Sequence, residues 1–457
     1  MQILSLAALV AVMSLMGIEP EPVLRPALLP LAVAYVAGSY LLAVVADRRG
    51  RRAIMRGLEK PAALLAWAGQ GYLLGGFIAL MLAGWGGWIT TGLHLTRVPL
   101  VGPVLAYLPF VLALLAHWYG VYGLDQAMRM RHRAELVLQD QVNLPTWTRR
   151  QYIVFNLRHN LLFIVLPGAL LVLATDLLQL VGDRLSPPLS AAIGLVLAGC
   201  VFLFAPAMLV RVWRTDSLPP GAARDRLTIL CRALKLKFRD IRLWQTGSVI
   251  TNAGVMGLVG PVRYVVLSDA MLEFMPPEAV EAVFMHEAGH VVHHHILTMM
   301  VFTIGLGGLL TAAGEAIGPL IHVSEQFLPY LEAAWVAVAA VAWLLIFGRL
   351  SRLLERQADV FGACNCLHAW YGQPMLTRER VALFNRSLLM VCRLNGMSAT
   401  ARNFRHGSIQ SRVDYLTGLI DAGQDEQQVN RQVRRVKRLC WAVLLAAIAV
   451  TVLLEMA

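Results

Sequence analysis

The sequence has little charge: 15% of its 457 residues are Asp, Glu, Lys or Arg, and 58% are hydrophobic. Two or three soluble domains would fit this length, but a chain with so few charges argues against them. A mean hydropathy of +0.61 is typical of proteins that cross a membrane several times. We therefore predict a mainly α, polytopic membrane protein in contact with the lipid bilayer.

Cysteine is also scarce, and the six residues show no regular disulfide framework. Cys364 and Cys366 form a C-x-C pair that could bind metal. With no second pair nearby, reduced structural thiols are the favoured interpretation. The sequence lacks a Walker-type Gly-x-x-x-x-Gly-Lys segment, so we expect no built-in ATP-driven unfolding.

Long apolar runs are abundant, and a bilayer span needs about 20 such residues. The first run could be a signal peptide, but no basic segment precedes it and no clear small-x-small site follows, so we retain it as a span. We predict nine spans, at about 2–18, 25–46, 62–86, 99–120, 160–181, 189–210, 297–321, 329–347 and 439–455.

Basic residues are distributed unevenly between the predicted loops. Arg and Lys crowd the loops after the second, fourth, sixth and eighth spans, and the alternate loops are short and poor in them. Every basic loop lies on one side if nine spans alternate from a cytoplasmic N-terminus. This positive-inside pattern explains the net charge of +12 without nucleic acid, which we do not expect as a partner. We expect a bacterial inner-membrane protein whose C-terminal residue lies on the far side.

Residues 286–290 read His-Glu-Ala-Gly-His, an H-E-x-x-H motif. Pro276, Pro277 and an early glutamate predict a helix start before it. On a helix His286 and His290 share one face, so both imidazoles can reach one zinc ion, and Glu287 can hold a metal-bound water. The alternative is a histidine-rich helix end at the membrane surface. We take three further residues as interfacial or as supports of the ligands rather than ligands themselves: His293, His294 and His295.

A catalytic zinc needs a third protein ligand and an open position for water. Glu355 and Asp359, four residues apart after the eighth predicted span, lie on one helical face. Glu355 can coordinate zinc, and Asp359 can accept a hydrogen bond from a ligand imidazole and so fix its tautomer. The alternative is a solvated pair of acids among arginines.

At these residues the chain resembles the integral-membrane zinc endopeptidases that include HtpX and the type 1 CAAX prenyl protease. Their pattern is H-E-x-x-H followed, beyond membrane helices, by E-x-x-x-D. Two further features match: Asn252-Ala253 before the zinc helix, and His406 followed by Arg412. Gly407 stands where the family has proline, which predicts a less rigid loop. The resemblance covers about residues 210–420 and implies a cytoplasmic α+β, gluzincin-like domain.

The resemblance implies one Zn²⁺ per chain, held by His286, His290 and Glu355, with Glu287 as general base. His406 or Arg412 could stabilise the oxyanion, although a structural ion pair is an equal possibility for Arg412. A strand at Asn252 and Ala253 could pair with an extended substrate or be plain sheet structure. The expected partners are protein or peptide substrates, above all membrane proteins. Oligomeric state and substrate identity are not predicted.

The predicted division of the chain follows from spans and motifs together. The ranges are 1–210 for an N-terminal membrane domain of six spans, 211–296 and 348–438 for the two parts of the peptidase domain, 297–347 for a transmembrane hairpin between them, and 439–457 for a C-terminal span.

Three other classes of protein were weighed against this prediction. An intramembrane protease of the site-2 class would need an Asp-Gly ligand motif, which is absent from the sequence. A metal transporter would need interior polar residues, and the predicted spans offer little beyond His117 and Glu315. A receptor or scaffold with a structural or degenerate zinc site remains the main alternative to an enzyme, although the motif residues are intact.

Overall fold

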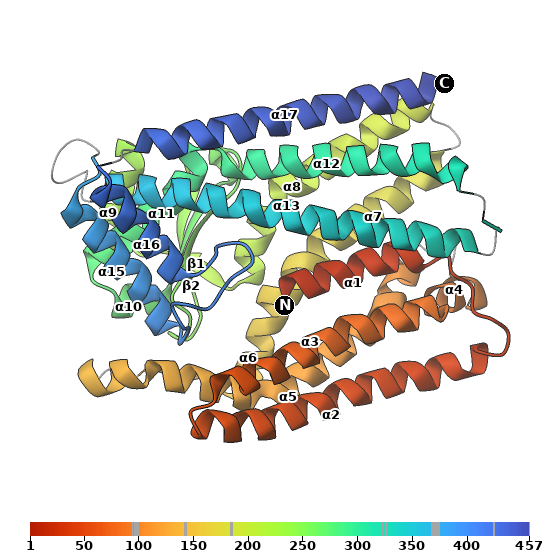
Figure 1. Cartoon of the computed structure of the whole chain (residues 1–457), viewed down its shortest axis with the longest axis horizontal. Helices are drawn as coiled ribbons and strands as arrows, with labels where there is room; N and C mark the ends of the chain where they lie inside the picture. The colour runs from red at the N-terminus through yellow and green to blue at the C-terminus, as the bar shows by residue number, and fades with distance from the viewer. Residues whose placement is uncertain are drawn as a thin grey trace. The chain divides into compact units, whose positions relative to one another are not determined.

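The computed structural model describes residues 1–93, 95, 100–140, 144–182, 186–321, 323–324, 327–366, 375–423 and 426–456. The chain forms two compact units (Figure 1). Unit 1 comprises Met1–Glu135 and Asn143–Arg214, and unit 2 comprises Leu136–Val142 and Thr215–Ala457.

Unit 1 is built from helices. Tyr35 on α2 donates a hydrogen bond of 2.6 Å to the carbonyl of Leu73 on α3, and these two helices pack along each other. The helices are α1 (Gln2–Leu15), η1 (Arg25–Ala27), α2 (Leu28–Met55), α3 (Glu59–Leu82), α4 (Trp85–Gly87), η2 (Trp88–Gly92), α5 (Val101–Asp140), α6 (Arg149–Asn156), η3 (Leu157–Leu161), α7 (Leu162–Gly182) and α8 (Pro187–Val212). The last residues of α5, from Leu136 on, belong to unit 2.

Eight helices within the described part of the chain are long and apolar enough to cross a membrane, and they overlap the second to ninth predicted spans. The predicted first span corresponds to α1, which has 14 residues and is about 21 Å long. A bilayer core is about 30 Å thick, so α1 is too short to cross it unaided. Its buried face, with Ala8 and Val12 fully enclosed, packs against α3 and α7. The polytopic, mainly α class is confirmed, with eight such helices rather than nine.

Unit 2 begins with a four-stranded sheet in the order β1-β2-β4-β3. β2 and β4 are parallel, the other two pairs are antiparallel, and Ala253 on β3 is opposite Leu267 on β4. β4 is buried along its whole length, whereas β3 is an edge strand that contacts α11. The elements are β1 (Thr215–Ser217), α9 (Ala222–Ala233), β2 (Asp240–Trp244), β3 (Ala253–Met256), η4 (Gly260–Val262), β4 (Tyr264–Ser268), α10 (Asp269–Phe274) and α11 (Pro277–Val292).

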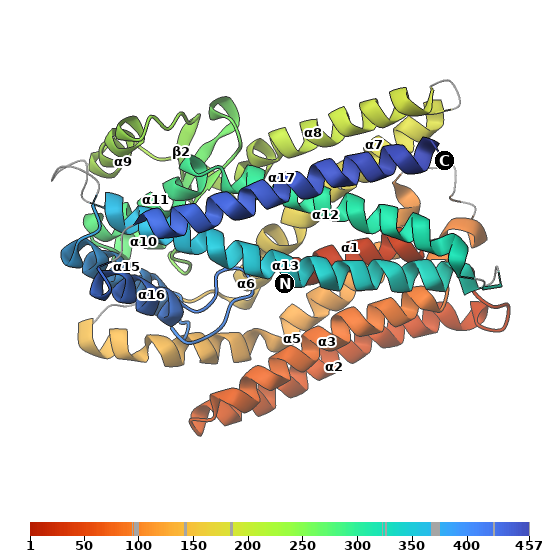
Figure 2. The ribbon, with the colours of Figure 1, turned by 45° about the horizontal axis from the view of Figure 1, so that its top comes forward.

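Long helices complete unit 2. Their apolar segments continue without a break into the part of the unit that contains the H-E-x-x-H motif. α13 is one continuous helix of 38 residues, so Glu355 and Asp359 stand on the same helix as the eighth predicted span. α12 and α17 lie side by side (Figure 2). The elements are α12 (His295–Ile317), η5 (Gly318–Leu320), α13 (Leu328–Asn365), α15 (Arg378–Leu394), α16 (Ile409–Asp421) and α17 (Glu426–Met456).

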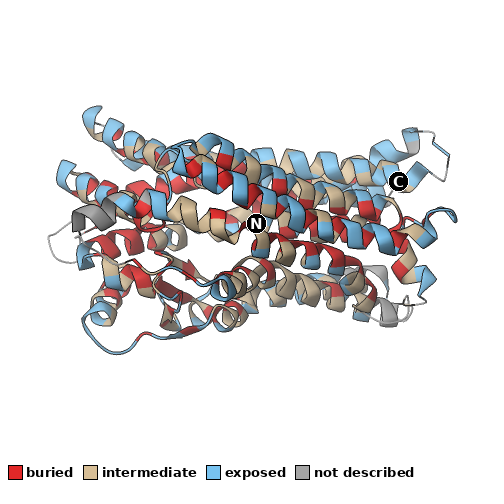
Figure 3. Cartoon of the chain, turned by 90° about the horizontal axis from the view of Figure 1, so that it is seen from below, coloured by how far each residue is buried: buried red, intermediate tan, exposed pale blue. Residues whose placement is uncertain are grey.

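Burial differs along these helices, as Figure 3 shows by colour. Val338 and Val341 on α13 are largely exposed, as are Leu445 and Leu453 on α17, which is typical of surfaces that face lipid. The other end of the same helices is enclosed. There the core includes the fully buried side chains of Leu354, Phe384, Leu416 and Val433. This core fixes the helices that carry the candidate site.

Candidate active site

Helix α11 carries the H-E-x-x-H residues on its inner face. It begins after the N-cap Pro276 with Pro277 and Glu278, which suit a helix start. It ends at Val292, and His294 adopts a left-handed conformation with φ of 53° before α12 begins. Apolar residues bury most of α11, so the helix is held from several sides.

The side chains of His286, His290 and Glu355 converge. The two Nε2 atoms are 3.3 Å apart, and each lies 3.5 Å from a different oxygen of Glu355. Ligand atoms about 2.05 Å from a tetrahedral zinc would be about 3.3 Å from one another. Glu355 Oε2 is buried and accepts no hydrogen bond from the described residues. The three residues therefore fit one metal ion.

A glycine lets the two ligand-bearing helices approach. A Cβ on Gly362 of α13 would lie 3.2 Å from the backbone N and Cα of His286 and 2.6 Å from Phe384. A Cβ at this position would be closer to its neighbours than almost any real Cβ atom is. Gly362 therefore allows α13 to approach α11 and to bring Glu355 against it.

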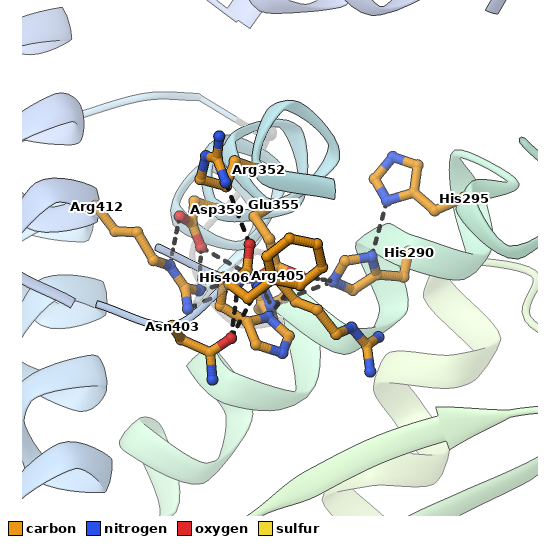
Figure 4. Close-up of polar contacts among 11 residues, drawn as sticks. His290, His295, Arg352, Glu355, Asp359, Asn403, Arg405, His406 and Arg412 are labelled. Carbon is orange, nitrogen blue, oxygen red and sulfur yellow. Dashed lines mark hydrogen bonds and ion pairs between the residues drawn. The ribbon is translucent and has the colours of Figure 1, made fainter. Parts of the chain in front are cut away.

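His286 is supported by a charged pair, Asp359 and Arg412, both labelled in Figure 4. Its Nδ1 lies 3.0 Å from Asp359, whose carboxylate accepts two hydrogen bonds from Arg412 on α16, one of them 2.8 Å long. Burial lowers the pKa of His286, but contacts with the carboxylates of Asp359 and Glu355 raise it to about 10. Metal binding at His286 thus has to displace a proton.

His290 is supported by neutral groups. Its Nδ1 lies 2.8 Å from Nδ1 of His295, and Nε2 of His295 lies 2.9 Å from Oε1 of Gln357. Gln357 in turn donates a hydrogen bond of 2.5 Å to Asn430 on α17. His295 and Gln357 are buried, so these groups are shielded from water.

The loop from Asn403 to Gly407 places His406 beside Glu355. Backbone hydrogen bonds of 2.9 Å in both directions join Asn403 and Gly407, and Nδ1 of His406 lies 2.9 Å from Glu355. Gly407 has a φ of +74°, which proline cannot adopt because its ring fixes φ near −65°. Two backbone hydrogen bonds thus close the loop with glycine at the position where the family has proline, and the lower rigidity expected there stays a prediction.

Glu287 is partly exposed on the same helix, between the two histidines. Burial raises the pKa of its carboxyl, and the Glu355 carboxylate adds to this, while His286 and Arg412 oppose it. A raised pKa suits a carboxylate that takes up a proton and releases it again.

Asn252 and Ala253 stand at the start of the edge strand. Ser268 accepts a hydrogen bond of 3.0 Å from the Asn252 backbone N–H. Asn395, at the end of α15, fixes the preceding residue: it accepts from the N–H of Thr251 at 3.0 Å and donates to its carbonyl at 2.7 Å. Asn395 therefore anchors the entry to β3.

Comparison with known proteins relates the segment that forms this site to a peptidase family. Residues 226–387 match the model of peptidase family M48, a segment that includes the H-E-x-x-H motif, Glu355 and Asp359. The match covers about a third of the chain and supports a metallopeptidase. His406 and Arg412 lie beyond the matched residues.

Solved structures add a match in fold over most of the chain. The chain is similar to the crystal structure of S. mikatae Ste24p, with a TM-score of 0.52, 15% sequence identity, and coverage of 87% of this chain and all of that one. At this identity the likeness concerns the fold alone. No curated protein matches the chain in sequence. The partial family match and the polytopic fold together support a membrane metallopeptidase, and they confirm the resemblance drawn from the motifs.

Several residues at or near the candidate site were not assigned roles from the sequence. Gln357 lies between Glu355 and Asp359 with no motif of its own, and Asn395 and Asn430 carry no recognisable signal. His295 was considered only within a run of three histidines. Its contact with His290 distinguishes it from exposed His294, and only the turn between α11 and α12 creates that difference.

Proposed function

We propose that this membrane metallopeptidase is a zinc-dependent endopeptidase that cleaves membrane or membrane-associated proteins. The observation that carries the proposal is the convergence of His286, His290 and Glu355 next to Glu287. Two imidazoles and one carboxylate are a typical ligand set for catalytic zinc, with a position left for water. When bound, zinc polarises a scissile carbonyl and makes water acidic enough to deprotonate near neutral pH.

The proton transfers are assigned to Glu287. Its carboxylate takes a proton from the attacking water and passes it to the leaving amine, which a side chain with a raised pKa does efficiently. No nearby carboxylate is equally free, because Glu355 faces both histidines and Asp359 is occupied by Arg412.

Of the two candidates for oxyanion stabilisation, His406 is preferred. Arg412 is buried and committed to Asp359 through two hydrogen bonds. The side chain of His406 is 41% exposed, so it can reach a substrate oxygen as well as Glu355. An imidazole N–H can stabilise the charge that develops on that oxygen.

Substrate binding is assigned to the edge strand β3 with Asn252 and Ala253 before and at its start. An extended peptide that adds to this edge would gain backbone hydrogen bonds, a mode that tolerates many sequences. The contact between β3 and α11 would bring such a peptide towards Glu287.

The test is Glu287→Gln, with purified protein in lipid nanodiscs. We expect full zinc content by elemental analysis and a fall in peptide cleavage of about 10²- to 10⁴-fold, since the amide cannot take up the proton. The control is Glu278→Gln on the same helix, whose carboxylate is half exposed. Cleavage by Glu287→Gln at the wild-type rate would overturn the mechanism. Proteomic comparison of membranes that carry wild type or Glu287→Gln would then identify substrates.

We also propose that the site faces the cytoplasm, on the basis of the basic loops. A cysteine at exposed Ser217, in a variant without the six native cysteines, should react with an impermeant reagent only from the cytoplasmic side. Labelling from outside would reverse the proposed orientation.

A further inference from the structure

A buried hydrogen-bond relay joins the metal ligand His290 to the C-terminal helix. It runs from His290 on α11 to His295 on α12, Gln357 on α13 and Asn430 on α17, with contacts of 2.8, 2.9 and 2.5 Å. His295 is fully buried, and Gln357 is 4% exposed. Four helices, the consecutive α11 and α12 and the more distant α13 and α17, thus share one line of polar contacts.

The polarity of this relay follows from the position of His290. Its Nε2 faces His286 and Glu355, so this nitrogen must be free of a proton to bind metal. A neutral imidazole then carries its proton on Nδ1 and donates it to His295. His295 accepts at Nδ1, carries its own proton on Nε2 and donates to Oε1 of Gln357. One proton arrangement satisfies every contact.

In its observed orientation, the Asn430 amide matches this arrangement and not the reverse. Its side-chain oxygen accepts from the Gln357 amide, which turns the Gln357 oxygen towards His295. A reversed Gln357 amide would donate to His295 Nε2, and His295 would then donate from Nδ1 to His290. His290 would have to keep its proton on Nε2, the atom required for metal.

A second contact ties α17 to the same turn. Lys437, two helical turns beyond Asn430, donates a hydrogen bond to the backbone carbonyl of His293, just before α12. α17 therefore holds both ends of the connection, the His293–His295 turn and the Gln357 amide.

We propose that Asn430 is a positioning residue for the metal site and that α17, through Gln357 and His295, sets the tautomer and orientation of His290. The inference rests on the proposed zinc site. It makes the C-terminal helix part of the metallopeptidase machinery in addition to a membrane span. Residues that support a metal ligand in this way change metal affinity by about 10- to 100-fold when they are replaced.

The first experiment replaces His295 in the full-length protein and measures zinc affinity by competition with a chelator. His295→Leu removes the acceptor and should weaken zinc binding by about 10- to 100-fold. His295→Asn places an amide oxygen near the position of Nδ1 and should restore most of the affinity. His294→Asn is the matched control, because His294 is exposed one residue earlier.

The second experiment addresses Asn430, which is partly exposed and tolerates replacement more readily. Asn430→Leu frees the Gln357 amide to reverse and should weaken zinc binding by about tenfold. Asn430→Asp keeps the acceptor and should bind zinc almost as wild type does. The visible absorption of the cobalt-loaded forms should change in Asn430→Leu and not in Asn430→Asp, a difference that a loss of packing alone would not produce.

The outcomes separate the two proposals. If wild type binds no zinc at His286, His290 and Glu355, the proposed function fails and the relay fails with it. If wild type binds zinc, and Asn430→Leu and Asn430→Asp bind it equally well with equal cobalt spectra, the inference alone is overturned.

Discussion

His286 and His290, the two histidines proposed as metal ligands, are four positions apart on one helix, and yet they are supported differently. His286 rests on Asp359, a carboxylate paired with the buried guanidinium of Arg412. His290 rests on His295, Gln357 and Asn430, none of which carries a charge in the relay. We call the support of His286 by Asp359 and Arg412 the charged arm, which reaches α16. We call the support of His290 by His295, Gln357 and Asn430 the neutral arm, which reaches α17.

The two arms differ in how much stability the fold loses when each arm is broken. A buried ion pair that loses one partner leaves an uncompensated charge, which destabilises the fold strongly. The loss of a neutral hydrogen bond costs less stability, although the metal ligand is then no longer held in its orientation. The charged arm should therefore link metal binding to folding, and the neutral arm should affect metal binding with little effect on folding.

The largest effect is expected from Glu355→Ala, which removes the ligand that faces both arms. Zinc should be lost or very weakly bound, and cleavage with it, because two histidines alone leave the site incomplete. Elemental analysis measures the metal, with exposed Glu379→Ala as control. Full metal content would remove Glu355 from the ligand set.

Asp359→Ala breaks the charged arm. The free energy of unfolding should fall by about 3 kcal/mol or more, because Arg412 stays buried without its main partner. Thermal unfolding in detergent measures this loss. The double variant Asp359→Ala with Arg412→Leu should recover part of the stability and none of the zinc affinity. Equal stability of both variants would contradict a charged support.

Gln357→Leu breaks the neutral arm with little change of volume. Zinc affinity should fall by about tenfold, while stability falls by only about 1 to 2 kcal/mol, because the Nε2 proton of His295 loses its acceptor. The comparison requires a larger loss of stability in Asp359→Ala. The reverse order would show that the arms do not differ as described.

The smallest effect is expected from Asn395→Leu, which leaves both arms intact. Loss of two hydrogen bonds to Thr251 should loosen the entry to β3 and raise KM by about tenfold, at unchanged kcat and zinc content. Exposed Thr400→Ala is the control. A fall in kcat at constant KM would place Asn395 outside substrate binding.

Much of the fold could be predicted because the bilayer imposes a length and a composition on each span. Hydropathy located the eight long helices, and only the short α1 departed from the prediction. The domain boundaries stay a prediction. Hydropathy alone could not reveal that α13 continues unbroken from its apolar part to Asn365. The surroundings of the helix change from exposed to enclosed along its length, while its backbone stays helical.

The candidate site was predictable where its residues share a helix. His286 and His290 are related by one helical turn, as are Glu355 and Asp359, so local geometry alone places each pair on one face. Asn395 and Thr251 are 144 residues apart, and Gln357 and Asn430 are 73 apart. No periodicity connects such positions, and their contacts exist only after the helices pack.

The sequence by itself determined the membrane class, the H-E-x-x-H motif and the candidate third ligand, because span length and helical spacing are local properties of the chain. The tertiary structure decided how the ligands are supported, since that depends on which helices meet. The contact between α11 and α13 gives His286 its charged partner, and the contacts among α12, α13 and α17 give His290 its neutral one. These contacts depend on close approach and complementary hydrogen bonding between segments far apart in the chain.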